Sequence, residues 1–263
     1  RRARTPSQLA PALDAVEAAL FVWASAPVTR GRRAVAAARV VFASVHIGHL
    51  VSSHTMPNTS IVGPNGAGKT TQISLARSYL ESCGLALIVT REPGGTELAE
   101  EIRELVLNRP TGMTPITEAL LIFAARAQHT AEVILPALQR GAWVLCDRYT
   151  DASFAYQGGG RGLGDGVIGE LEKIATNSLQ PDLTLLLDLE VEEGILRSGA
   201  RGEAVDRFES ENLLFKRRVR ESYLQRQSQC SERIKLIDGA LTADAVHSRI
   251  VEELDSLREK SHG

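Results

Sequence analysis

The chain has 263 residues, of which 43% are hydrophobic and 24% are charged, an ordinary balance for a soluble globular protein. Its length suits a single α/β enzyme. The formal net charge of −2 argues against a general nucleic-acid-binding surface. No stretch of about 20 uncharged apolar residues is present, so the sequence predicts no membrane-spanning helix.

The cysteines indicate a reducing compartment. Cys83, Cys146 and Cys230 lack the spacing of a metal site, and an odd number of thiols cannot all pair. We therefore expect reduced thiols and a cytoplasmic location.

Residues 1–55 differ from the rest of the chain. They carry seven Arg and two acidic residues, a net charge of +5, so residues 56–263 carry the remaining −7. Residues 7–26 have helical spacing of apolar side chains. Three explanations stay open: upstream sequence counted as protein with Met56 the true start, an organelle presequence, or an additional helix. We expect 1–55 to be an atypical extension outside the catalytic fold and 56–263 to form the catalytic domain.

Apolar runs and helical patterns alternate from residue 59 onward. The apolar runs predict strands at 60–62, 85–90, 142–146, 183–189 and 234–237, with the run at 85–90 buried on both faces. Helices are predicted at 69–82, 97–108, 114–140, from the Gly-rich loop 158–166 to about 178, 192–199, 208–228 and 242–260. In the helix at 97–108, the apolar residues expected to face inward are Leu98, Ile102, Leu105 and Val106. This order predicts an α/β fold with a five-stranded parallel sheet flanked by helices on both faces.

The segment from Gly63 to Thr70 fits the phosphate-loop pattern G-x-x-x-x-G-K-[ST] at every fixed position. Its glycines let backbone N–H groups point at a phosphate chain, and the following helix adds its positive dipole end. Lys69 can reach the β- and γ-phosphates, and the Thr70 hydroxyl can bind Mg²⁺. The residues expected to bind ATP are Gly63, Pro64, Asn65, Gly66, Ala67, Gly68, Lys69, Thr70 and Thr71. The sequence of the loop also suits a transporter ATPase, but the chain has no Leu-Ser-Gly-Gly signature, so we discount that class.

An acidic residue ends the third predicted strand. Asp147 has the Walker-B arrangement, which holds Mg²⁺ or its water, and Arg148 beside it can bridge an acceptor phosphate. Downstream, Tyr156 and Gln157 are expected in a flexible loop near the same strand end.

A base-binding site is suggested by two further segments. A Pro93-Gly94-Gly95 turn after the second strand lets a small ligand approach the backbone. In the helix at 114–140, Ile122 and Arg126 share one face. They could hold a flat base and read its edge, with core packing beside a surface arginine as the alternative.

The basic residues after Asp188 are typical of a lid, at about 194–207, that closes over a transferring phosphoryl group; they are Arg197, Arg201 and Arg207.

Together these motifs resemble the bacterial thymidylate kinases over residues 59–254. The matching segments are Thr-Arg-Glu-Pro-Gly-Gly-Thr at 90–96, Asp-Arg-Tyr at 147–149, Ala-Tyr-Gln-Gly at 155–158 and Pro-Asp-Leu-Thr at 181–184. The resemblance implies a P-loop NTPase fold, a homodimer, and transfer of the ATP γ-phosphate to dTMP with Mg²⁺, giving dTDP.

The resemblance also implies residue roles. Arg103 and Arg148 hold the dTMP phosphate, Arg126 and Gln157 read thymine, and Tyr156 crowds the sugar 2′ position. Because the phosphate loop carries no arginine, the chain matches the subgroup with lid arginines, led by Arg201. The catalytic set is then Lys69, Asp147, Arg148, Arg197, Arg201 and Arg207, and the metal ligands are Thr70 and Asp147. The dTMP-binding set is Asn65, Pro93, Arg103, Ile122, Phe123, Arg126, Arg148, Tyr156 and Gln157.

Three positions depart from the family pattern. Val62 and Asn65 stand where the family usually has acidic residues. Ile122 stands where an aromatic residue stacks on thymine, a contact worth about 1–3 kcal/mol. Phe123 is one residue later, about 100° around the helix. These departures leave two alternatives open: a kinase for another nucleoside monophosphate, and a degenerate nucleotide-binding protein with the same fold.

Overall fold

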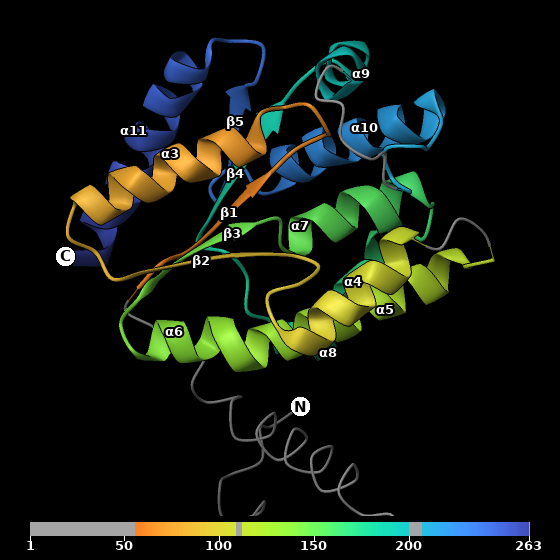
Figure 1. Ribbon diagram of the computed structural model, residues 1–263, viewed down its shortest axis with the longest axis horizontal. Coiled ribbons are helices and arrows are strands. Elements are labelled where there is room, and N and C mark those ends of the chain that lie inside the picture. The colour runs from red at the N-terminus through yellow and green to blue at the C-terminus, as the bar shows by residue number, and fades with distance from the viewer. Residues whose placement is uncertain (1–55, 109–111, 200–206, 263) are drawn as a thin grey trace, which may run out of the picture. The chain divides into compact units, whose positions relative to one another are not determined.

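The computed structural model describes residues 56–108, 112–199 and 207–262. The expectations for residues 1–55 and for Arg201 lie outside the described residues. Within the described part, a central sheet is enclosed by helices on both faces (Figure 1).

The sheet is parallel and five-stranded, in the order β2-β3-β1-β4-β5. Its strands are β1 (Asn58–Val62), β2 (Leu87–Arg91), β3 (Trp143–Asp147), β4 (Leu183–Asp188) and β5 (Ile234–Asp238). The predicted fold class is therefore confirmed. The carboxyl ends of β1 and β3, which are paired neighbours, place the phosphate loop beside Asp147.

The helices are α3 (Lys69–Ser82), α4 (Glu97–Asn108), α5 (Pro115–His129), α6 (Leu135–Gln139), α7 (Thr150–Ser153), α8 (Asp165–Thr176), α9 (Val191–Gly199), α10 (Leu213–Gln229) and α11 (Ala243–His262). Two π-helical segments, η2 (Thr130–Ile134) and η3 (Phe154–Gly160), connect some of them. The start of α10 lies later than predicted because Asn212 caps it, its Oδ1 accepting from the Phe215 N–H at 2.9 Å.

The helix predicted at 114–140 is continuous in space but contains a π-helical turn, η2, before α6. Pro136 near the start of α6 has no N–H to donate to the preceding turn. A wider turn before the proline accommodates this missing hydrogen bond.

The expected flexible loop around Tyr156 and Gln157 is wrong, because both residues lie in the buried segment η3. The glycines that suggested flexibility instead allow close packing against α10. A Cβ atom on Gly159 would lie 2.5 Å from Ser222 Cβ, and one on Gly160 would lie 2.6 Å from Phe215 Cε2.

Two apolar layers hold the sheet. On one face, α3 and α11 pack with Ile61, Leu145 and Leu185. On the other face, Val62 and Leu186 contact a cluster from η3 and α10. Val62, where the family resemblance implies an acidic residue, packs into this apolar layer.

Two burial expectations are wrong. The strand β2 is half-buried, with Val89 37% exposed, because it forms an edge of the sheet. On α4, Leu98 is 49% and Leu105 is 43% exposed, whereas Ala99 and Val106 are buried. Ala99 and Val106 lie on the inward face of α4, and each leucine precedes one of them and so points about 100° away from that face.

Candidate active site

The phosphate loop lies between β1 and α3, and two of its glycines leave no room for a side chain. A Cβ on Gly63, whose φ is +145°, would lie 2.3 Å from the Leu187 carbonyl oxygen. One on Gly66 would lie 2.2 Å from the carbonyl oxygen of Gly194 in α9. The start of the predicted lid therefore packs backbone to backbone against the loop. Lys69 Nζ donates to the Pro64 carbonyl over 2.8 Å, across the base of the loop.

Asp147 has the features of a metal-binding carboxylate. It pairs in register with Ile61, two residues before Gly63. Its Oδ1 is buried and accepts no hydrogen bond from the described residues. The Thr70 side chain is exposed at the start of α3. Mg²⁺ prefers oxygen ligands and completes its shell with waters and phosphates, so these residues fit such an ion.

Arg148 connects the phosphate loop to the adjacent cleft. Its backbone is left-handed, with φ of 66°, and Cys146 Sγ donates to its carbonyl oxygen at 2.9 Å. The guanidinium donates to the Gly63 carbonyl at 3.1 Å and to Asn65 Oδ1 at 2.9 Å. Burial acts to lower the pKa of Arg148, but the neighbouring Tyr156 hydroxyl and other oxygens outweigh it and raise that pKa. The side chain is thus a fixed cation. Burial also raises the pKa of the Cys146 thiol, which stays protonated and able to donate.

A cleft of about 530 Å³ opens beside Arg148. All residues expected to bind dTMP except Phe123 line this cleft. Phe123 is buried against Phe154 and Ile168, so the expectation that it contacts the base is wrong. The 100° step from Ile122 turns Phe123 into the core. Arg103 donates to the Pro93 carbonyl at 2.9 Å and lies at the edge of the cleft.

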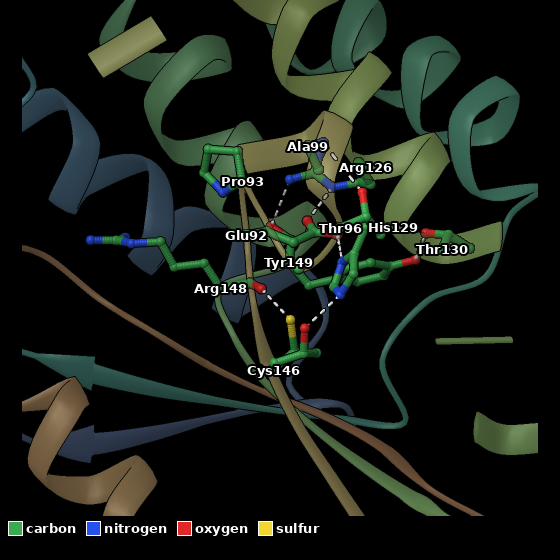
Figure 2. A network of polar contacts seen from close by, with 12 residues as sticks. Glu92, Pro93, Thr96, Ala99, Arg126, His129, Thr130, Cys146, Arg148 and Tyr149 are labelled. Atoms are coloured by element: carbon green, nitrogen blue, oxygen red, sulfur yellow. Dashed lines mark hydrogen bonds and ion pairs between the residues drawn. The ribbon is translucent and has the colours of Figure 1, made fainter. Parts of the chain in front are cut away.

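Arg126 is held by a buried polar network at the wall of the cleft (Figure 2). Its Nε donates to Glu92 Oε2 at 2.6 Å, its Nη1 to Ser153 Oγ at 2.9 Å and its Nη2 to the Tyr149 carbonyl at 3.3 Å. A guanidinium has more N–H donors than these contacts use, so donors remain for a ligand. Figure 2 shows Arg126 and His129 converging on Glu92, while the Arg148 side chain points away.

Glu92 stays ionised in this network. Burial acts to raise its pKa, but Arg126 and the His129 hydrogen bond outweigh burial, and the net effect lowers the pKa. His129 Nδ1 is 2.9 Å from Glu92 Oε1 and its Nε2 is 2.6 Å from Thr90 Oγ1. Since a carboxylate only accepts, the Nδ1 N–H of His129 donates to Glu92, and Nε2 shares a hydrogen bond with the Thr90 hydroxyl. Sequence reasoning missed both residues, although His129 follows Arg126 at the i+3 spacing of a shared helix face.

Gln157 lies in η3 and lines the cleft, and a second buried carboxylate, Glu118, holds its side chain. Its Nε2 donates to Glu118 Oε1 at 3.0 Å. Arg161 and Arg207 pair with the same carboxylate at 3.0 and 2.8 Å. Glu118 was also assigned no role from the sequence. The signal available in the sequence was an acidic residue in a largely apolar helix.

Two of the predicted lid arginines lie elsewhere than expected. Arg207 pairs with Glu118, at the Gln157 side of the cleft. Arg197 donates to the Gly239 carbonyl at 2.7 Å and pairs with Glu193 at 2.5 Å. The hydrogen bonds and ion pairs described for these two arginines are with groups outside the phosphate loop. The Arg197–Glu193 pair has the i,i+4 spacing of one helix face, whereas the contact between Arg207 and the distant Glu118 could not be predicted from the sequence.

This fold and site define a class: P-loop kinases with a donor loop, a strand-end aspartate and a separate acceptor cleft containing fixed arginines. Residues 61–250 match the family model described as thymidylate kinase. The thymidylate kinase of Pseudomonas putida is 50% identical over 205 residues, covering 78% of this chain and 97% of that protein. That of Alkalilimnicola ehrlichii is 49% identical over 198 residues, covering 75% and 91%.

A solved structure agrees with this assignment. The crystal structure of thymidylate kinase from Ehrlichia chaffeensis superposes with a TM-score of 0.63 at 28% identity, covering 76% of this chain and 98% of that chain. The chain therefore belongs to the thymidylate kinase family.

Proposed function

We propose that this chain is an ATP-dependent nucleoside monophosphate kinase that phosphorylates dTMP to dTDP. The observation that carries the proposal is the position of Arg148, which contacts the phosphate loop through Gly63 and Asn65 while lining the acceptor cleft. A cation between donor and acceptor sites can hold the acceptor phosphate in line with the ATP γ-phosphate. The family relationship supports dTMP over the other acceptors and over a degenerate binding protein.

The roles follow from the placement of the side chains. Lys69 and the loop N–H groups hold the ATP phosphates, while Arg148 and Arg103 hold the acceptor phosphate. Thr70 and Asp147 would hold Mg²⁺, which neutralises charge on the donor phosphates when it is bound. Arg126 and Gln157 face the base.

A coupled ATPase assay with dTMP, dUMP, CMP, UMP and AMP tests this function. We expect turnover with dTMP to exceed that with the other monophosphates. Good turnover with another acceptor and none with dTMP would reject the proposal. Binding of ATP without transfer to any acceptor would support a degenerate protein instead.

We also propose a homodimer. The apolar residues left exposed on the adjacent helices α4, α5 and α8 (Figure 1) are Leu98, Leu105, Ile116, Leu120, Val167 and Ile174. Several exposed apolar side chains on neighbouring helices suit a surface that another chain covers, and the family resemblance favours a second copy. Light scattering should give twice the monomer mass, and Leu120→Glu should shift the protein toward monomer.

A cytoplasmic location is part of the same proposal. Cys83, Cys146 and Cys230 are all free thiols, as expected in a reducing compartment. Among the residues described, no helix combines the length and apolar content needed to cross a bilayer.

A further inference from the structure

Gln157 and Glu118 form a buried pair at the base side of the cleft. Gln157 is 2% exposed and Glu118 is fully buried. The two residues come from different elements, η3 and α5, and meet through the hydrogen bond from Gln157 Nε2 to Glu118 Oε1. A glutamine side chain can present either its amide N–H₂ or its carbonyl oxygen to a ligand. The group it meets inside the protein decides which of the two faces the cleft.

The surroundings of Glu118 settle that choice. Arg161 Nε lies 3.1 and 3.0 Å from its two carboxylate oxygens, and Arg207 Nη2 lies 2.8 Å from Oε2. Two cations stabilise the ionised form of a buried carboxyl group. An ionised carboxylate has acceptors and no donor, so Gln157 must turn its N–H₂ toward Glu118. The Gln157 carbonyl oxygen is then the group available to a ligand.

We propose that Glu118 is a positioning residue that sets base specificity through Gln157. With the amide fixed, the cleft offers an acceptor at Gln157 and donors at Arg126. This pattern fits a pyrimidine with a ring N–H beside a keto oxygen, as in thymine. Cytosine presents a ring acceptor beside an amino group, and it opposes both contacts. The inference rests on the proposed dTMP kinase function and deepens it.

The test is Glu118→Gln, assayed with dTMP and dCMP. The introduced side chain keeps its oxygen toward Arg161 and Arg207, so its new N–H₂ group faces Gln157. Gln157 must then rotate and turn its own N–H₂ group toward the base. Replacing one matched contact by a mismatched one should raise the KM for dTMP about 10- to 100-fold and raise the dCMP-to-dTMP ratio of kcat/KM. The KM for ATP and kcat should change by no more than about twofold, because the phosphate groups are untouched.

A matched control is Glu172→Gln. Glu172 is a buried glutamate on α8 that also accepts from a glutamine, Gln180 Nε2 at 3.3 Å, and it does not line the cleft. This control should keep the wild-type KM for dTMP and the wild-type selectivity. A second test places Glu118→Gln in a Gln157→Leu background, where it should cause no further rise in the KM for dTMP.

The outcomes separate this inference from the proposed function. Absence of dTMP turnover in the wild-type enzyme overturns the function. With an active wild type, unchanged KM and selectivity in Glu118→Gln overturn the inference, as does a further rise of about tenfold in the Gln157→Leu background. If Glu118→Gln does not fold, Gln157→Leu alone decides: a dTMP-over-dCMP preference reduced about tenfold supports the acceptor role, and an unchanged preference refutes it.

Discussion

The guanidinium of Arg148 donates to the side-chain oxygen of Asn65 over 2.9 Å, joining the end of β3 to the phosphate loop across 83 residues of sequence. This contact fixes a cation between the phosphate loop and the neighbouring cleft. The contact uses the amide of Asn65, where the resemblance to the thymidylate kinases implies a carboxylate.

Arg148→Ala should lower kcat/KM for dTMP by about 10²–10³-fold, because it removes preorganised donors from the transferring phosphoryl group. Arg148→Lys should recover only part of this loss, since an ammonium lacks the planar fork that reaches two acceptors. Steady-state kinetics with varied dTMP measures both effects. Near-normal activity of Arg148→Ala would refute the placement of the acceptor phosphate.

Asn65→Asp should lower the KM for dTMP severalfold while kcat stays within about threefold. A carboxylate accepts more strongly from Arg148 and from a sugar hydroxyl than an amide oxygen does, a difference of roughly 1 kcal/mol. Asn65→Leu, of similar size but without an acceptor, should raise the KM. Equal KM values in the two variants would show that the side chain at this position takes no part in acceptor binding.

Ile122→Phe should lower the KM for dTMP about five- to tenfold, in line with about 1 kcal/mol from stacking on a base. Ile122 lines the cleft, whereas Phe123 is buried in the core and cannot supply this contact. Ile122→Leu keeps an aliphatic wall and should leave the KM nearly unchanged. If the phenylalanine variant also keeps the wild-type KM, the base does not lie over this face of α5.

Local patterns allowed the five parallel strands, the phosphate loop and the Asp147–Arg148 pair to be predicted, because each pattern is formed by residues close in sequence. The sequence could not show that Gly159 and Gly160 pack against α10, since a glycine run is equally compatible with a mobile loop. It also could not show that Glu92 and Glu118 are buried. Their roles depend on arginines 34 and 43 residues away, which only the folded chain brings near.

His129→Leu should raise the KM for dTMP and lower the free energy of unfolding by about 1–3 kcal/mol, because Glu92 loses one of its two donors in a buried site. His129→Asn can keep an amide N–H near the Nδ1 position and should retain part of both properties. Urea titration and dTMP kinetics measure the two effects. A loss of stability with an unchanged KM for dTMP would show that His129 does not position Arg126.

The buried carboxylate of Asp151 should make stability depend on pH. Arg233 donates to its two oxygens at 2.7 and 2.8 Å, and Arg226 Nε donates at 3.0 Å. Burial acts to raise the pKa of Asp151, but the Arg233 hydrogen bonds and the nearby charges outweigh it, so the folded pKa lies below the ordinary value of 3.8. A group with a depressed folded pKa stabilises the protein above its unfolded pKa, and this stabilisation is lost as the pH falls through the folded pKa.

Asp151→Asn should therefore lower the free energy of unfolding by about 3–5 kcal/mol at neutral pH, because two partly buried arginines lose their buried counterion. The difference between the variant and the wild type should shrink as the pH falls below about 4, where the wild-type carboxylate of the unfolded chain takes up a proton. Urea titrations at pH 7 and at several values between 4 and 3 measure this difference. A constant difference over that range would mean that the ionised carboxylate does not provide the stabilisation.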